Sequence, residues 1–238
     1  MFAGLFLSFL VMNTEEKLLE FLMGYVSENR QQRFNEVIQN RTRHITMVIE
    51  NVFQPHNASA VLRSCDCFGI QDVHVIENYN SYKVNPNIAL GASKWLNMYK
   101  YNEKEYNTVE CLTSLKEKGY TLVATSPHKY DYTISELPLD NKVAVMLGTE
   151  LQGLTDQAFE MADCIVNIPM FGFTESFNIS VSAALIMYEL TKRLHETDIN
   201  WQLTKEEKLQ VMLGWARNGV KKSDAIEKTF RRRNIEDS

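Results

Sequence analysis

Short apolar segments of strand-like composition alternate along this chain with segments of helical composition, and this alternation limits the folds open to it. The strand-like segments cover residues 45–50, 72–77, 120–125, 143–147 and 164–168. The helix-like segments lie between them, near residues 57–68, 107–118, 155–162 and 178–195. Strands that alternate with helices form a mostly parallel sheet, because parallel neighbours need a crossover connection that usually contains a helix. We therefore predict an α/β fold with helices on both faces of the sheet.

Both ends of the chain are predicted to be helical. Apolar residues recur at helical spacing in residues 13–40, and a break near Gly24 separates two helices there. The tail predicts two more helices, at residues 205–217 and 223–232. We divide the chain into an N-terminal leader with helices (1–44), an α/β domain (45–198) and a C-terminal helical extension (199–238).

Composition excludes several classes of protein. A hydrophobic content of 45% is enough for a sizeable core. Residues 1–12 are apolar but shorter than the roughly 20 residues of a membrane span, and they lack the basic region of a signal peptide. We expect residues 1–11 to be an artefactual or disordered leader, and no membrane partner. The scattered cysteines indicate reduced thiols in or near the core of a cytoplasmic protein. The histidines form no HxxxH or HExxH pair, so we expect no metal.

Polar residues follow the first predicted strand. Residues 51–57 lead into a helix in which Asn57 is well placed as the N-cap. Arg63 lies close to two turns further on, near the same side of the helix. It follows Val61 and Leu62, and a guanidinium in such apolar surroundings needs an anionic partner. The alternatives are a purely capping Asn57 and a surface arginine.

Two later strands also end in polar segments. The strand at residues 143–147 ends in Leu147 and enters a turn that contains Gly148, Glu150 and Gly153. This turn is neither a GxGxxG fingerprint nor a P-loop. The strand at residues 164–168 leads through Ile168-Pro169-Met170 and a short loop to Ser176-Phe177-Asn178, which opens a helix and could simply cap it. Ligands bind at the carboxyl ends of strands in open α/β sheets, so the three segments predict one composite site.

These segments resemble the three sequence motifs of the SpoU class of RNA ribose 2′-O-methyltransferases, over about residues 45–194. In the third motif Phe177 replaces the usual leucine, which enlarges one wall of the cofactor pocket. The resemblance implies an α/β domain whose C-terminal part is threaded into a deep trefoil knot. It also implies S-adenosylmethionine as the cofactor and a homodimer.

The resemblance assigns roles to individual residues. It implies a catalytic group of Arg63, Asn57, Glu150, Ser176 and Asn178. It implies cofactor contacts from Thr125, Leu147, Gly148, Gly153, Ile168, Met170 and Phe177. In the family proposal the arginine is the general base. Because deprotonating a guanidinium at neutral pH costs about 7–9 kcal/mol, an alternative keeps Arg63 charged, holding a substrate phosphate and stabilising the developing alkoxide.

Two further stretches resemble the TrmH branch of this class, which methylates the D-loop guanosine at position 18 of tRNA. They are residues 91–95, which include Lys94, and the N-terminal arginines Arg30, Arg33 and Arg41, for which the resemblance implies RNA binding. The net charge of −5 means that tRNA must be held by a local basic patch. The alternatives are a ribosomal RNA 2′-O-methyltransferase and a non-catalytic RNA-binding protein.

Overall fold

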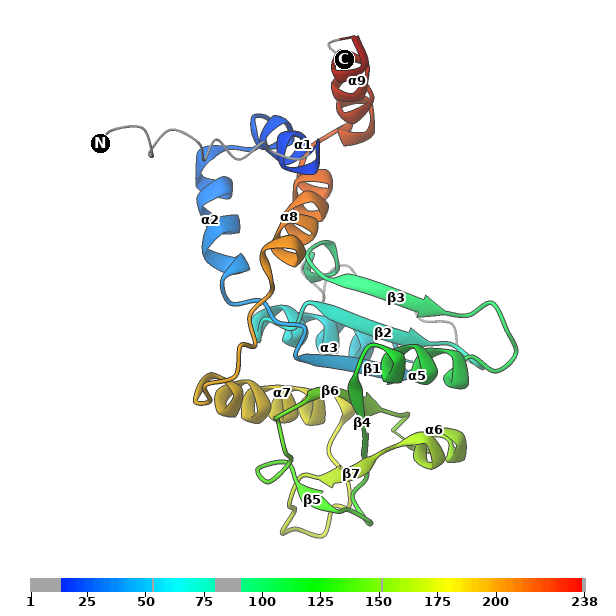
Figure 1. The fold of residues 1–238 in the computed structure, drawn as a ribbon. Helices are drawn as coiled ribbons and strands as arrows, with labels where there is room; N and C mark the ends of the chain where they lie inside the picture. Colours follow the sequence, from blue (N-terminus) through cyan, green and yellow to red (C-terminus); the bar gives the residue numbers. More distant parts are fainter. Residues whose placement is uncertain (1–13, 53, 80–90, 151, 237–238) are drawn as a thin grey trace. The chain divides into compact units, whose positions relative to one another are not determined.

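The structure is a computed structural model that describes residues 14–52, 54–79, 91–150 and 152–236 (Figure 1). The chain divides into two compact units. One is an α/β unit, Asn40–Gln202, and the other is a helical unit made from both ends of the chain, Met1–Gln39 and Leu203–Ser238. The expectation for residues 1–11 lies outside the described residues. None of the described helices is long and apolar enough to cross a membrane.

Within the described residues, the α/β unit contains a seven-stranded parallel sheet in the order β3-β2-β1-β6-β4-β7-β5. The strands are β1 (Ile45–Glu50), β2 (Asp72–Ile76), β3 (Asn97–Tyr101), β4 (Tyr120–Thr125), β5 (Tyr132–Thr133), β6 (Lys142–Leu147) and β7 (Cys164–Asn167). All five predicted strands are present. Two strands were not predicted, because β5 has only two residues and β3 is a half-exposed edge strand without an apolar run.

Helices cover both faces of the sheet, as predicted. Helices α3 (Pro55–Cys67) and α7 (Ile179–His195) pack on one face, and α5 (Thr108–Glu117) and α6 (Asp156–Met161) pack on the other. Strand β1 shows the alternation that this requires. Met47 and Ile49 join the core beneath α3 and α7, whereas Val48 joins the core beneath α5 and α6.

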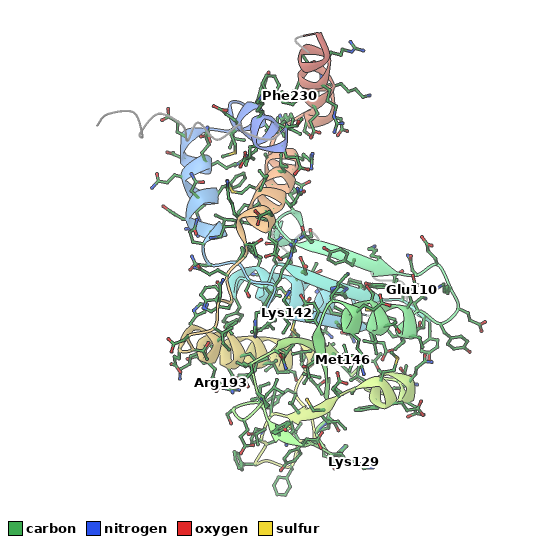
Figure 2. The ribbon with its side chains drawn as sticks, viewed as in Figure 1. Glu110, Lys129, Lys142, Met146, Arg193 and Phe230 are labelled. Carbon is green, nitrogen blue, oxygen red and sulfur yellow. The ribbon has the colours of Figure 1, made fainter. Side chains whose placement is uncertain are left out.

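The end of α7 is fixed by one arginine. Arg193, labelled in Figure 2, donates to the carbonyl oxygens of Ile134 and Leu137 at 2.9 and 2.7 Å. The side chains of these two residues lie in the same core as Leu190 and Leu194 of α7. The segment between β5 and β6 is therefore held against α7 by both polar and apolar contacts.

The helical unit joins segments that the sequence placed in two separate extensions. Helices α1 (Thr14–Met23) and α2 (Glu28–Ile38) precede the α/β unit, and α8 (Lys205–Gly219) and α9 (Ser223–Glu236) follow it. Its core combines Leu22 of α1 with Leu213 of α8 and Phe230 of α9. Helix α2 joins through Phe34, whose ring centroid lies 5.4 Å from that of Trp215.

The four cysteines are free thiols, but they are not equally buried. Burial raises the pKa of Cys65 and of Cys111, and it raises the pKa of the half-buried Cys164 to about 11, so these three remain protonated at neutral pH. Cys67 differs from the expectation of core or near-core thiols, because it lies exposed at the end of α3.

We predict that Arg193→Met lowers the free energy of unfolding by about 1–3 kcal/mol, because two carbonyl groups lose their donor while the apolar stem remains. Lys192→Met is the matched control, since Lys192 is the residue before Arg193 and its side chain is exposed. Urea unfolding followed by circular dichroism measures both. Equal stability of the two variants would show that the hydrogen bonds from Arg193 to Ile134 and Leu137 do not stabilise the fold.

Candidate active site

A cavity of about 480 Å³ opens at the carboxyl ends of β4, β6 and β7. This size is typical of small-molecule sites. All seven residues for which we predicted cofactor contacts line it: Thr125, Leu147, Gly148, Gly153, Ile168, Met170 and Phe177. Glu150 and Ser176 line it as well. The structure thus brings the second and third polar segments to one cavity.

The turn after β6 needs glycine at its first position. A Cβ atom at Gly148 would lie 2.0 Å from the carbonyl carbon of Gly153, which no side chain can tolerate. Thr149 and Gly153 exchange two backbone hydrogen bonds of 2.9 and 3.0 Å, which close the turn on itself. Gly153 has a φ of +70°, a conformation that L residues with side chains rarely adopt. The two glycines therefore shape this wall of the cavity.

Three predicted catalytic residues form one hydrogen-bonded cluster. The Oε1 atom of Glu150 accepts from the side-chain amides of Asn57 at 2.9 Å and Asn178 at 2.5 Å. The Nδ2 atom of Asn178 also lies 3.2 Å from the Oδ1 atom of Asn57. Within the described residues, the second carboxylate oxygen of Glu150 has no hydrogen-bond partner. A carboxylate oxygen of this kind is able to accept a hydrogen bond from a ligand.

The two asparagines differ in how they relate to their helices. Asn178 is the N-cap of α7, and its Oδ1 atom accepts from the backbone N–H of Ser180 at 2.9 Å while its Nδ2 atom binds Glu150. Capping and membership of the cluster are thus compatible. Asn57 is not a cap, because α3 begins at Pro55 and its N-cap position is Gln54.

A buried carboxylate, Glu50, accepts hydrogen bonds from the residue that follows the turn after β6. Glu50, at the end of β1, is 1% exposed and accepts from the hydroxyl groups of Thr108 and Thr155 at 2.6 and 2.9 Å. It also accepts from the backbone N–H of Thr155 at 2.9 Å. Thr155 caps α6 and lies two residues after Gly153. Glu50 was not predicted as a functional residue, although a carboxylate ending an otherwise apolar strand is a signal for such a role.

Arg63 lies apart from this cluster. It is exposed on α3 and lines a separate groove of about 510 Å³ between α3 and α7, with Phe68, Val181, Leu185 and Tyr188 among the other walls. No hydrogen bond or ion pair to it occurs among the described residues. Its apolar neighbours in sequence, Val61 and Leu62, are buried because adjacent helical residues point in different directions. The Arg63 side chain is thus exposed beside apolar groove walls, and its contact with a substrate phosphate stays a prediction.

The residues predicted to bind RNA have different positions. Arg41 is 2% exposed, forms an ion pair with Asp66 and donates to the carbonyl oxygen of Ile70. Arg41 is therefore buried in the interior and is not available to contact RNA. Arg30 and Arg33 are exposed on α2, and Lys94 is exposed in the short helix η1 (Ala92–Lys94).

Other residues of the cavity were not predicted. Ser182 and Ile186 follow Asn178 at intervals of four residues on α7, so one face of this helix forms a wall of the cavity. The helical spacing from Asn178 could have revealed them. Asn167, at the end of β7, also lines the cavity, and its buried Oδ1 atom has no hydrogen-bond partner among the described residues. A bound ligand with a donor group would satisfy such an atom.

Comparison with known proteins identifies the family. Residues 44–188 match the SpoU rRNA methylase family, and the chain belongs to it. A tRNA (guanosine(18)-2′-O)-methyltransferase from Borreliella burgdorferi is 38% identical over 211 residues, which cover 89% of this chain and 95% of that protein. The crystal structure of the A. aeolicus TrmH/SpoU tRNA modifying enzyme is similar with a TM-score of 0.73 and 30% identity, over 82% of this chain and 98% of that one.

A structure with a bound cofactor has the same fold. The SpoU methyltransferase AviRb from Streptomyces viridochromogenes, solved in complex with AdoMet, has a TM-score of 0.57 and 20% identity, over 68% of this chain and 65% of that one. This chain is an S-adenosylmethionine-dependent methyltransferase. The cavity fits this cofactor, because its lining combines apolar side chains such as Leu147 and Ile168 with polar ones and the unpartnered oxygen of Asn167.

We predict that Gly148→Ala weakens S-adenosylmethionine binding at least about ten-fold, because the added methyl group forces the turn after β6 out of place. Gly172→Ala is the control, since a Cβ atom there meets only one backbone atom, at 3.9 Å. Isothermal titration calorimetry measures the affinity of both folded variants. Unchanged binding by Gly148→Ala would show that this turn does not shape the cofactor site.

Proposed function

We propose that this protein methylates the ribose 2′-oxygen of guanosine 18 in the D-loop of tRNA. The observation that carries the proposal is the Asn57–Glu150–Asn178 cluster beside the cavity. It occurs in a chain that is 38% identical to a tRNA (guanosine(18)-2′-O)-methyltransferase. A carboxylate oriented by two amides is well suited to position a hydroxyl group, because its second oxygen is left to accept a hydrogen bond.

The chain's own groups orient the ribose rather than perform a covalent step. S-Adenosylmethionine supplies a methyl group on a sulfonium when it is bound. The unpartnered oxygen of Glu150 accepts a hydrogen bond from the 2′-hydroxyl of the target ribose, and Asn57 and Asn178 keep the carboxylate from turning away. Ser176, on the rim of the same cavity, offers a second hydroxyl contact. The hydroxyl proton leaves to a substrate phosphate or to water as the oxygen becomes methylated.

Arg63 acts as a cation in this proposal. It is exposed on α3, where a substrate phosphate can reach its guanidinium group. Its charge is suited to hold a phosphate next to the target nucleoside and to stabilise the developing alkoxide. This role requires Arg63 to reach a cavity that it does not line in its own chain.

In a homodimer, Arg63 of one subunit can reach the cavity of the other subunit. The groove that contains Arg63 is bordered by Val181, Leu185 and Tyr188, which are 44%, 39% and 55% exposed. Apolar side chains grouped on one face are typical of protein interfaces. In the proposed dimer this face of α3 and α7 packs against the same face of a second copy, and Arg63 enters the partner's site.

Mixed dimers test this arrangement. Arg63→Ala and Asn178→Ala should each be inactive, whereas coexpression of the two should restore roughly a quarter of wild-type activity, because half of the dimers carry one intact composite site. The measurement is methyl transfer by the purified mixture, with light scattering to confirm the dimer. No recovery in mixed dimers of correct mass would place Arg63 and Asn178 in the same subunit's site.

Contacts to tRNA outside the cavity are proposed for Arg30, Arg33 and Lys94. Arg33 pairs with Glu36 at 3.3 Å, but both side chains are largely exposed, and such a pair is weak enough to exchange for a phosphate. Arg30 donates to the carbonyl oxygen of Gly219 at 3.4 Å, which leaves most of its donors available.

The trefoil knot is also part of the proposal. Its support is the position of α7, which forms a wall of the cavity through Ser182 and Ile186 and is clasped at its end by the Arg193 contacts to Ile134 and Leu137. In a knotted chain, α7 would follow the threaded segment, and these contacts would hold it between the cofactor cavity and the segment before β6.

The decisive test is methyl transfer from labelled S-adenosylmethionine to an unmodified tRNA transcript, with the guanosine-18-to-adenosine transcript as the control. We expect transfer to the first transcript alone, and loss of at least about 100-fold in kcat/KM for Glu150→Ala. Transfer to ribosomal RNA instead would favour the ribosomal RNA alternative. Cofactor binding without transfer to either RNA would favour a non-catalytic RNA-binding protein.

A further inference from the structure

The loop between β7 and α7 exposes two phenylalanines completely. Phe171 and Phe173 are 97% and 108% exposed relative to the reference residue, more than any other large hydrophobic side chain in the described part of the chain. Phenylalanine offers only a large apolar surface and an aromatic face, and neither gains from contact with water. Two such side chains on one short loop indicate a contact that forms when a partner binds.

The loop stands at the rim of the cofactor cavity and not at the groove of Arg63. Met170 on one side of the two phenylalanines and Glu175 on the other both line the cavity. None of the residues from 170 to 177 lines the groove between α3 and α7. The rings therefore lie beside the cavity that the substrate enters, and they do not line the groove assigned to the dimer contact.

The charged side chains next to the loop indicate which part of an RNA substrate can bind beside Phe171 and Phe173. Glu150 and Glu175 both border the cavity mouth and are exposed, and within the described residues no lysine or arginine lines the cavity. Carboxylates repel a phosphate group. A nucleobase is uncharged and presents an aromatic face, so it is the part of an RNA that suits two phenylalanines beside two carboxylates.

The loop is also close enough along the chain to reach the base. Phe173 precedes Ser176 by three residues, which span at most about 11 Å, and Asn178 by five. A Cβ atom at Gly172 would meet only one backbone atom, at 3.9 Å, so there is room beside the loop.

We propose that Phe171 and Phe173 form the stacking site for the base of the target nucleoside while its ribose lies at the Glu150 cluster. This rests on the proposed function and adds the group that holds the base. Enzymes that act on one nucleotide of a folded RNA must take it out of its surroundings, and stacking on aromatic side chains compensates for the lost stacking in the RNA. Stacking is tolerant of base identity, so the two rings supply affinity and geometry rather than selection of guanine.

The experiment compares wild type with the double variant Phe171→Leu/Phe173→Leu, which keeps the apolar bulk but removes both aromatic faces. Each is measured for the Kd of an intact tRNA transcript and of a transcript that lacks the base at the target nucleotide, in the presence of S-adenosylhomocysteine. Phe171→Tyr/Phe173→Tyr retains the aromatic faces, and Tyr106→Leu removes an aromatic side chain that is 59% exposed outside the cavity. Calorimetry with S-adenosylmethionine and light scattering check the cavity and the assembly.

The leucine variant should bind the intact transcript about ten-fold more weakly, which is about 1.4 kcal/mol, and the transcript without the base less than about two-fold more weakly than wild type does. The tyrosine variant and Tyr106→Leu should bind both transcripts as wild type does, and cofactor affinity and dimer mass should not change. Equal loss on the two transcripts, no loss on either, or a change of mass would overturn the stacking site while leaving the proposed function in place. A wild type that does not methylate the intact transcript would overturn the proposed function, and the stacking site with it.

Discussion

The parallel pairing of β1 with β6 is the constraint on which the site depends. The two strands run in register from Ile45–Val143 to Ile49–Leu147, although almost a hundred residues separate them in the sequence. Because β2 pairs with the other edge of β1, the strand order reverses at β1 and β6, and the connections that follow these two strands begin side by side. Helix α3 starts after β1, and the turn at Gly148 starts after β6. Asn57 and Glu150 therefore meet across 93 positions of sequence.

Two carboxylates at this edge of the sheet have opposite tasks. Glu50 is buried and shares its oxygens among three donors, as a buried carboxylate must if it is not to destabilise the fold. It fixes Thr155 and so the end of the turn that carries Glu150. Glu150 is exposed and gives only one oxygen to protein donors. Through Thr155, Glu50 thus helps to hold the turn that carries Glu150 in place.

The sequence predicted the parts of the fold that follow from local pattern. The five apolar strands and the helices between them were found because period and length distinguish them, and the glycine turn and Asn178 were found because their residue types are demanding. Strand β3 was missed because an edge strand with a half-exposed pattern carries no such signal. The positions of Arg41 and Arg63 could not be predicted either, since a charge in the sequence does not reveal which way its helix or loop faces. Asp66, the partner of Arg41, lies 25 residues away and comes close only through the fold.

The proposed RNA contacts include both charged and uncharged side chains. The chain carries a net charge of −5, and two carboxylates border the mouth of its cavity, so the RNA backbone cannot be drawn in by a positive cavity. Cations lie elsewhere, on α2, in η1 and in the groove that contains Arg63. Uncharged stacking on Phe171 and Phe173 then supplies affinity where charge cannot. Since stacking releases no counterions, the contribution of these rings to binding should be the same at low and high salt, whereas that of Arg33 should fall as salt rises.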